Sequence, residues 1–128
     1  MQIDDALFIF NDNEEYNQSC VRGGGNAIIR KYNKHSSLDR PRSVGIPTGT
    51  LEDGGYEKLT QKVKRIVDNS IEEIKYLLSN FKYKRLFFSS DNNGKLGTKI
   101  FVVDENVINY ITKQIYSLTS QSSVYLIL

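Results

Sequence analysis

The sequence predicts a small single α/β domain, residues 1–128, in which helices flank a mixed β-sheet and copies of the chain form an oligomer. Three observations predict this class. The length of 128 residues suits one domain. A hydrophobic content of 39%, with 8 tyrosines and 6 phenylalanines, argues against a disordered chain. Short apolar runs also alternate with segments that have the apolar spacing of helices.

Four apolar runs predict the strands. Residues 6–10 form a buried strand that ends at a turn of residues 11–13. Residues 43–47 form a short extended piece, and the proline at its end confines it to a sheet edge or a strand end. Residues 83–88 and 124–128 complete the set. If the last strand is unpaired within its own chain, it would recruit a second copy.

Two long segments carry apolar side chains at helical spacing. Residues 59–78 present one apolar face, and residues 48–55 before them are expected to form two glycine-containing turns. Asp104 is a good N-cap for a last helix. The buried side of that helix is expected to hold Val107, Ile108, Ile111 and Ile115. A shorter helix is predicted over residues 27–32, with Asn26 as its N-cap.

Charge is distributed unevenly along the chain. The formal net charge of +2 and the pI of about 8.6 argue against a general DNA- or RNA-binding protein. Residues 1–19 contain five acidic residues and no basic one, whereas residues 20–45 sum to +5 and residues 81–100 to +4. If the fold brings the two basic segments together, they form a local positive pocket for a small anionic ligand.

Several protein classes are excluded on simple grounds. No apolar run approaches the roughly 18 residues of a membrane span, and the acidic N-terminal residues lack the basic region of a secretory signal. Cys20 is the only cysteine and His35 the only histidine, so neither an internal disulfide nor a zinc site is expected. The flanks of these two residues match no nucleophile motif. We therefore expect a cytoplasmic protein without a metal, a cofactor or a membrane partner.

A glycine-rich segment offers the first candidate site, for a phosphate. Three consecutive glycines before a helix start present free backbone N–H groups at the positive end of the helix dipole, and two arginines add charged donors. The segment is neither a Walker loop nor a dinucleotide fingerprint, and a flexible surface turn is the alternative. The residues expected to bind are Arg22, Gly23, Gly24, Gly25, Asn26 and Arg30.

Two further loops suit a polar ligand. In residues 45–49 the Thr48 hydroxyl lies beside glycines, although a plain junction between a strand and a turn is the alternative. The loop after residues 83–88 offers Asn92 and Thr98 for a ribose or a base edge. Ligands of α/β sheets lie at the carboxyl ends of strands, which is where this loop begins.

Aromatic and acidic residues complete the candidates. Phe81, Phe87 or Phe88 could stack on a base, and strand alternation places one of the last two in the core. Asp12 and Asp91 could form a carboxylate pair for acid–base chemistry, but both lie in predicted turns, where aspartate is common. A nucleotide pocket without catalytic groups, which binds its ligand and leaves it unchanged, is a coherent interpretation of these residues.

Four motifs in order resemble those of a family of small phage proteins. They are FNDN at residues 10–13, GGGNAIIR at 23–30, GIPTG at 45–49 and GKLGTKI at 94–100. With the last predicted helix that follows them, they span nearly the whole chain. This order resembles the Thoeris anti-defense proteins of the first type. The glycine-rich turns here carry additional asparagine and lysine, a departure that bears on which loop residue makes which contact.

The resemblance implies a function that is not enzymatic. Such proteins act as sponges that sequester, without cleaving it, the cyclic ADP-ribose isomer (gcADPR) made by TIR-domain defence proteins in the host cytoplasm. They are homo-oligomers built from dimers, with pockets near the dimer interface, and some hold cyclic trinucleotides of CBASS at a second pocket. Two alternatives remain. One is a hydrolase of nucleotides or ADP-ribose-like substrates that uses Asp12 or Asp91, and the other is a protein-binding inhibitor that acts through the C-terminal strand.

Overall fold

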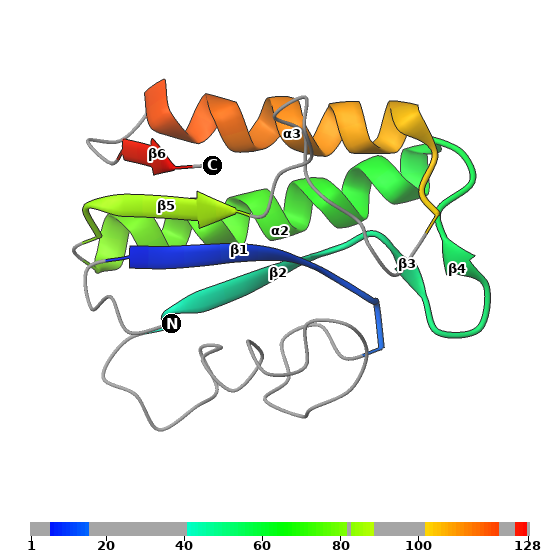
Figure 1. Cartoon of the computed structure of the whole chain (residues 1–128), viewed down its shortest axis with the longest axis horizontal. Helices are drawn as coiled ribbons and strands as arrows, with labels where there is room; N and C mark the ends of the chain where they lie inside the picture. Colours follow the sequence, from blue (N-terminus) through cyan, green and yellow to red (C-terminus); the bar gives the residue numbers. More distant parts are fainter. Residues whose placement is uncertain (1–5, 16–40, 82, 89–101, 121–124, 128) are drawn as a thin grey trace.

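The computed structural model describes residues 6–15, 41–81, 83–88, 102–120 and 125–127. These residues form a β-sheet, two long helices and a small hairpin, which confirms the predicted α/β class (Figure 1). In chain order the elements are β1 (Ala6–Asp12), β2 (Ser43–Pro47), β3 (Gly49–Thr50), β4 (Gly54–Gly55), α2 (Gln61–Asn80), β5 (Arg85–Phe88), α3 (Glu105–Ser120) and β6 (Tyr125–Ile127).

The main sheet has four strands in the order β2-β1-β5-β6, and each neighbouring pair in it is parallel. In the inner strand β1, Ile9 lies opposite Val44 of β2 and Phe88 of β5. The sequence predicted a mixed sheet, but antiparallel pairing among the described strands is confined to β3 and β4. The reason lies in the connections. Helix α2 joins β2 to β5 and α3 joins β5 to β6, and a helical crossover returns the chain in the same direction.

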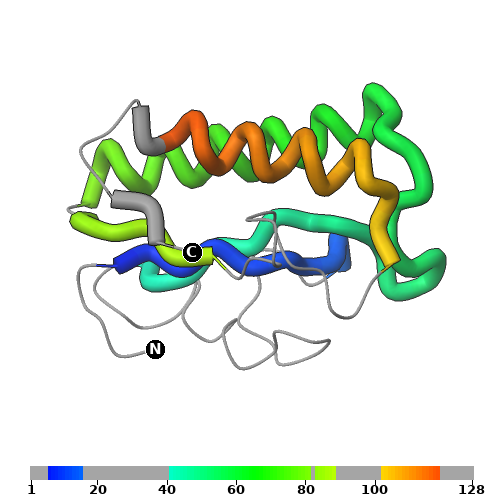
Figure 2. Tube along the Cα trace, turned by 45° about the horizontal axis from the view of Figure 1, so that its top comes forward, coloured from blue at the N-terminus to red at the C-terminus, as the bar shows by residue number. Residues whose placement is uncertain are grey.

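Helices α2 and α3 lie side by side on one face of the sheet (Figure 2). The predicted apolar face of residues 59–78 is confirmed, because α2 buries Val63, Val67, Ser70, Ile71, Ile74 and Leu77. On α3, Val107, Ile111 and Ile115 are fully buried, and Ile108 packs against the same core while partly exposed. One apolar core therefore lies between this pair of helices and the sheet.

The starts of both described helices are capped by side chains. Thr60 Oγ1 accepts a hydrogen bond from the Val63 N–H at 3.2 Å at the start of α2. Asp104 precedes α3, and its carboxylate accepts from the Asn106 N–H at 3.1 Å, as the sequence predicted. Each cap satisfies an N–H group that has no partner within its helix.

The strand predictions are confirmed with changed limits. β1 continues to Asp12, two residues beyond the predicted end. Pro47 is the last residue of β2, and β2 is an edge strand of the described sheet. Residues 125–127 pair with residues 85–87 of β5. The terminal strand therefore has a partner in its own chain, so the argument for oligomers from an unpaired strand no longer applies.

The β3–β4 hairpin replaces the two turns predicted over residues 48–55. Gly49 lies opposite Gly55, and Thr50 lies opposite Gly54. A Cβ on Gly49 would meet the Gly54 carbonyl oxygen at 2.2 Å, so the two strands approach closely only because a glycine stands there. Gly54 has a φ of 78°, in the left-handed region that glycine adopts readily.

Candidate functional site

The carboxyl end of the parallel sheet is the candidate site. The strand after β1 in the chain is β2, on one side of β1, and the next strand of this sheet, β5, lies on its other side. The strand order therefore reverses at β1, and α/β sheets hold ligands at such a switch point, beyond the carboxyl ends of the strands. β1 ends at Asp12 and β2 at Pro47, and the β3–β4 hairpin follows at the same end of the sheet (Figure 1).

The peptide group that follows Asp12 is fixed on both sides. The Asp12 carbonyl oxygen accepts two hydrogen bonds from Thr48, one from its N–H at 2.9 Å and one from its Oγ1 at 3.2 Å. The Asn13 N–H of the same peptide group donates to Asp12 Oδ1 at 2.8 Å. Asp12 and Asn13 are each 2% exposed and Thr48 is 0% exposed. We call these three residues the edge junction.

Backbone hydrogen bonds connect the edge junction to the hairpin and to α3. The Glu14 N–H donates to the Gly49 carbonyl at 3.0 Å, and the Tyr56 N–H donates to the Thr48 carbonyl at 2.9 Å. The Asp104 N–H then donates to the Tyr56 carbonyl at 2.8 Å. Because Asp104 also caps α3, the start of this helix has a fixed position relative to the end of β1.

A hollow of about 380 Å³ lies between the hairpin and the first turns of α2. Its charged lining consists of the carboxylates of Glu14, Asp53 and Glu57 and the ammonium group of Lys62. Tyr56 also lines it, and burial together with the nearby Glu14 carboxylate raises the pKa of the Tyr56 hydroxyl. The excess of carboxylates makes this hollow unfavourable for a phosphate.

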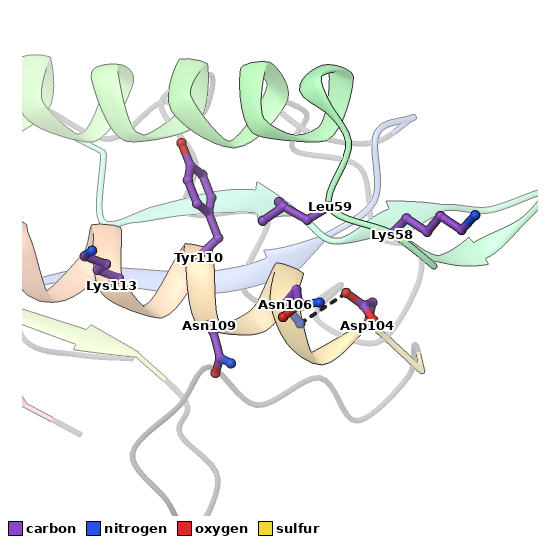
Figure 3. A pocket seen from close by; sticks show the side chains of 7 residues that line it. All are labelled: Lys58, Leu59, Asp104, Asn106, Asn109, Tyr110 and Lys113. Carbon is purple, nitrogen blue, oxygen red and sulfur yellow. Dashed lines mark hydrogen bonds between the residues drawn. The ribbon is translucent and has the colours of Figure 1, made fainter.

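A second hollow, of about 570 Å³, lies beside the first turns of α3 (Figure 3). Lys58 and Lys113 bring two positive charges to it against the single carboxylate of Asp104. Asn106 and Asn109 add side-chain amides, which can both donate and accept hydrogen bonds. Of the two hollows, this one is the more favourable for an anion.

Tyr110 in the wall of the second hollow holds α3 against α2. Its Oη donates to Asp68 Oδ1 at 2.5 Å, and the Lys64 Nζ lies 5.9 Å from the centre of its ring. The pKa of Tyr110 is raised, mainly by the hydrogen bond to Asp68. Both the ring and the hydroxyl are thus engaged in contacts between the two helices.

Three of the residues predicted to bind ligand are described, and the structure does not bring them to one place. Thr48 lies at the carboxyl end of the sheet, where its hydroxyl has a partner within the protein. Phe81 follows α2 and therefore lies toward the opposite end, where its ring packs edge-to-face on Tyr83 with centroids 6.3 Å apart. The predicted residues that lie outside the described ranges are Arg22, Gly23, Gly24, Gly25, Asn26, Arg30, Asn92 and Thr98.

The structure decides which of the two adjacent phenylalanines of β5 is in the core. Phe88 is 2% exposed and packs edge-to-face on Tyr116 with ring centroids 6.0 Å apart. Phe87 is partly exposed, and the Arg85 guanidinium lies 6.0 Å from the centre of its ring. Phe88 thus contributes to packing, and its stacking on a base stays a prediction.

Sequence reasoning missed Tyr56 and Asn13 as parts of this site. The sequence predicts a turn at Asn13, but the residue is buried directly after the inner strand. Tyr56 follows Gly55 at the end of the hairpin, and its backbone joins the edge junction to α3. The available signal was weak, since one polar residue after a strand and one tyrosine after a glycine turn are both common.

Two searches of the described residues concern metal ligands and membrane-spanning helices. No group of three His, Cys, Asp or Glu side chains within these ranges could hold a metal ion. None of the helices in the same ranges is long and apolar enough to cross a bilayer. Cys20, His35 and Asp91 lie outside the described ranges.

Comparison with known proteins gives no relative. No family model matches the chain, and neither the curated proteins nor the solved structures include a significant match. The functional argument therefore depends on the residues and on the geometry described above.

Proposed function

We propose that the chain binds gcADPR, the cyclic ADP-ribose isomer, and sequesters it without cleavage in the cytoplasm of the host cell. The proposal follows the Thoeris anti-defense proteins that the motif order resembles. It includes a homo-oligomer built from dimers and cyclic trinucleotides as a second class of ligand. The observation that carries it is the switch point of the parallel sheet at β1, where α/β folds hold nucleotides.

Each chemical group of the ligand requires a different kind of contact, and the predicted residues can be assigned to these groups. A pyrophosphate requires backbone N–H groups and cationic donors, which the glycine-rich segment with Arg22 and Arg30 would supply. Ribose hydroxyls and a purine edge require groups that donate and accept, a role that suits Asn92 and Thr98. In this proposal the buried edge junction fixes the carboxyl end of the sheet and does not bind the phosphate.

A sponge acts by stoichiometry, so it must bind tightly. Sub-micromolar affinity requires more than roughly 8 kcal/mol of binding free energy. Hydrogen bonds to charged groups contribute about 1.5–3 kcal/mol each. A few such contacts to the pyrophosphate, together with stacking of the purine, are therefore sufficient.

A ligand-return experiment tests the proposal. The protein is incubated with gcADPR, separated from free ligand by gel filtration, denatured by heat and analysed by chromatography. We expect intact gcADPR to be released in amounts proportional to the protein. Release of a hydrolysed product would contradict sequestration and would support the hydrolase alternative.

Variants at the predicted phosphate and base contacts provide the second test. Arg30→Ala and Asn92→Ala should lose ligand retention while the protein stays folded. Lys75→Ala is the matched control, because Lys75 pairs with Glu72 at 3.2 Å on the surface of α2 and has no place in the proposed site. Wild-type retention by both site variants would contradict our assignment of the contacts.

Thermal unfolding distinguishes the two nucleotide hypotheses, sponge and hydrolase, from the protein-binding inhibitor. Ligand at about one hundred times its dissociation constant should stabilise the folded protein by about 2.7 kcal/mol. If neither gcADPR nor a cyclic trinucleotide raises the melting temperature, both nucleotide hypotheses fail. A host protein that copurifies with the chain through its C-terminal strand would then support the inhibitor alternative.

A further inference from the structure

We propose that Thr48 is a positioning residue, which fixes the carboxyl end of the sheet for ligand binding without touching the ligand. This inference rests on the proposed function for the identity of the ligand. It starts from the observation that Thr48 is 0% exposed and bonded within the protein by its N–H, its hydroxyl and its carbonyl. The bonds of the N–H and the hydroxyl meet at one atom, the Asp12 carbonyl oxygen.

The Thr48 hydroxyl acts on Asp12 through a peptide group. A peptide group is planar, so the direction of its carbonyl also sets the direction of its N–H. Thr48 holds the carbonyl oxygen of this group, and its N–H, which belongs to Asn13, donates to Asp12 Oδ1 at 2.8 Å. The hydroxyl thereby orients a buried carboxylate to which it makes no hydrogen bond.

The same residue sets the positions of three elements at the switch point. The Thr48 carbonyl accepts the Tyr56 N–H, and the Tyr56 carbonyl accepts the N–H of Asp104, which caps α3. Thr48 therefore joins the end of β1, the hairpin and the start of α3. A ligand held beyond the strand ends depends on the relative positions of these elements, so a small shift among them lowers affinity while the core stays folded.

Removal of one hydroxyl tests this role. Thr48→Val deletes the hydroxyl but keeps the backbone N–H bond to Asp12. Thr50→Val is the matched control, because it likewise removes a hydroxyl that makes one hydrogen bond. The Thr50 hydroxyl accepts from the Asp53 N–H at 2.9 Å in the exposed turn of the hairpin. The affinity for gcADPR is measured by calorimetric titration. We expect Thr48→Val to bind gcADPR about five- to tenfold more weakly than wild type, because this ratio corresponds to the net contribution of one hydrogen bond.

The controls separate positioning from general damage. Thr50→Val should bind like wild type, and Thr48→Ser, which restores a hydroxyl, should recover most of the affinity. Circular dichroism checks that each variant is folded, and Thr48→Ala replaces the valine variant if that one fails to fold. Unchanged gcADPR affinity in a folded Thr48 variant that lacks the hydroxyl would overturn the proposal.

A measurement without ligand tests the structural step of the inference separately from the proposed function. Hydrogen exchange of the Asn13 amide, followed by NMR, reports the bond to Asp12 Oδ1 directly. We expect this amide to exchange at least about fivefold faster in Thr48→Val and at the wild-type rate in Thr50→Val. Unchanged exchange in Thr48→Val overturns the inference whatever the ligand is. Failure of the wild-type protein to bind gcADPR contradicts the proposed function instead.

Discussion

Two glycines of the β3–β4 hairpin should respond differently to the same substitution. In Gly49→Ala the new Cβ would lie 2.2 Å from the Gly54 carbonyl oxygen and 2.7 Å from the Gly55 Cα, so the strands must separate by about 1.2 Å to reach an ordinary contact of 3.4 Å. Such crowding costs about 1–3 kcal/mol, and the hydrogen bonds lost on opening cost about 1 kcal/mol each. We expect Gly49→Ala to lower the free energy of unfolding by about 3 kcal/mol.

Gly54→Ala is the internal control for this prediction. A Cβ there meets no atom within 4 Å, so the cost comes only from its φ of 78°. The left-handed conformation costs a residue with a Cβ about 1–2 kcal/mol, and Gly54→Asn should cost less because asparagine tolerates that region. Urea unfolding followed by circular dichroism measures all three variants. A loss for Gly49→Ala no larger than that for Gly54→Ala would refute the close approach of the two strands.

Three further predictions concern the core, the helix pair and pH. Ile111→Ala should destabilise the protein by about 2–5 kcal/mol in thermal unfolding, because its side chain is fully buried. Tyr110→Phe removes the exposed hydrogen bond to Asp68 and should lower the free energy of unfolding by about 0.5–1 kcal/mol. A larger decrease would contradict the exposed position of this hydrogen bond. Because burial raises the pKa of Tyr56, the folded state holds this proton more tightly than the unfolded state. The free energy of unfolding should therefore fall as pH rises above about 10, and Tyr56→Phe should reduce that fall in urea titrations at pH 9 to 11.

Local patterns were enough to predict the two long helices and the strands of the main sheet. The apolar spacing of residues 59–78 predicts α2, because a helix of that length must bury one face. Asp104 predicts the start of α3, because its carboxylate satisfies an N–H of the first turn. Pro47 predicts the end of β2, because it has no N–H for a ladder. In each case the residues that predict the element lie within that element or directly beside it.

The candidate site could be predicted only in part because its contacts join distant residues. Thr48 stood out as a hydroxyl beside glycines, but its partner Asp12 lies 36 positions away in the sequence. Alternation along β5 could not choose between Phe87 and Phe88, because the choice depends on packing with Tyr116 from α3. The parallel order of the strands likewise depends on the path of the connections, which no single strand encodes.

Asp12 separates the binding hypothesis from the hydrolytic one. It is 2% exposed, and its Oδ1 accepts the Asn13 N–H at 2.8 Å. We call Asp12 an anchor if its side chain acts only as the acceptor that holds the Asn13 N–H. In that case Asp12→Asn should keep most of the gcADPR binding, because an amide oxygen can accept the same hydrogen bond. Asp12→Ala should lose binding, since it leaves a buried N–H without that acceptor.

A general base, in contrast, requires the carboxylate itself. Any hydrolysis that depends on Asp12 should therefore disappear in Asp12→Asn while binding remains. The ligand-return experiment on both variants distinguishes the two roles. Intact ligand from wild type and from Asp12→Asn supports an anchor, whereas product from wild type and intact ligand from Asp12→Asn identifies a catalyst. Equal loss of binding in both variants would contradict the anchor role, because Asp12→Asn keeps a side-chain oxygen that can accept the Asn13 N–H and Asp12→Ala does not.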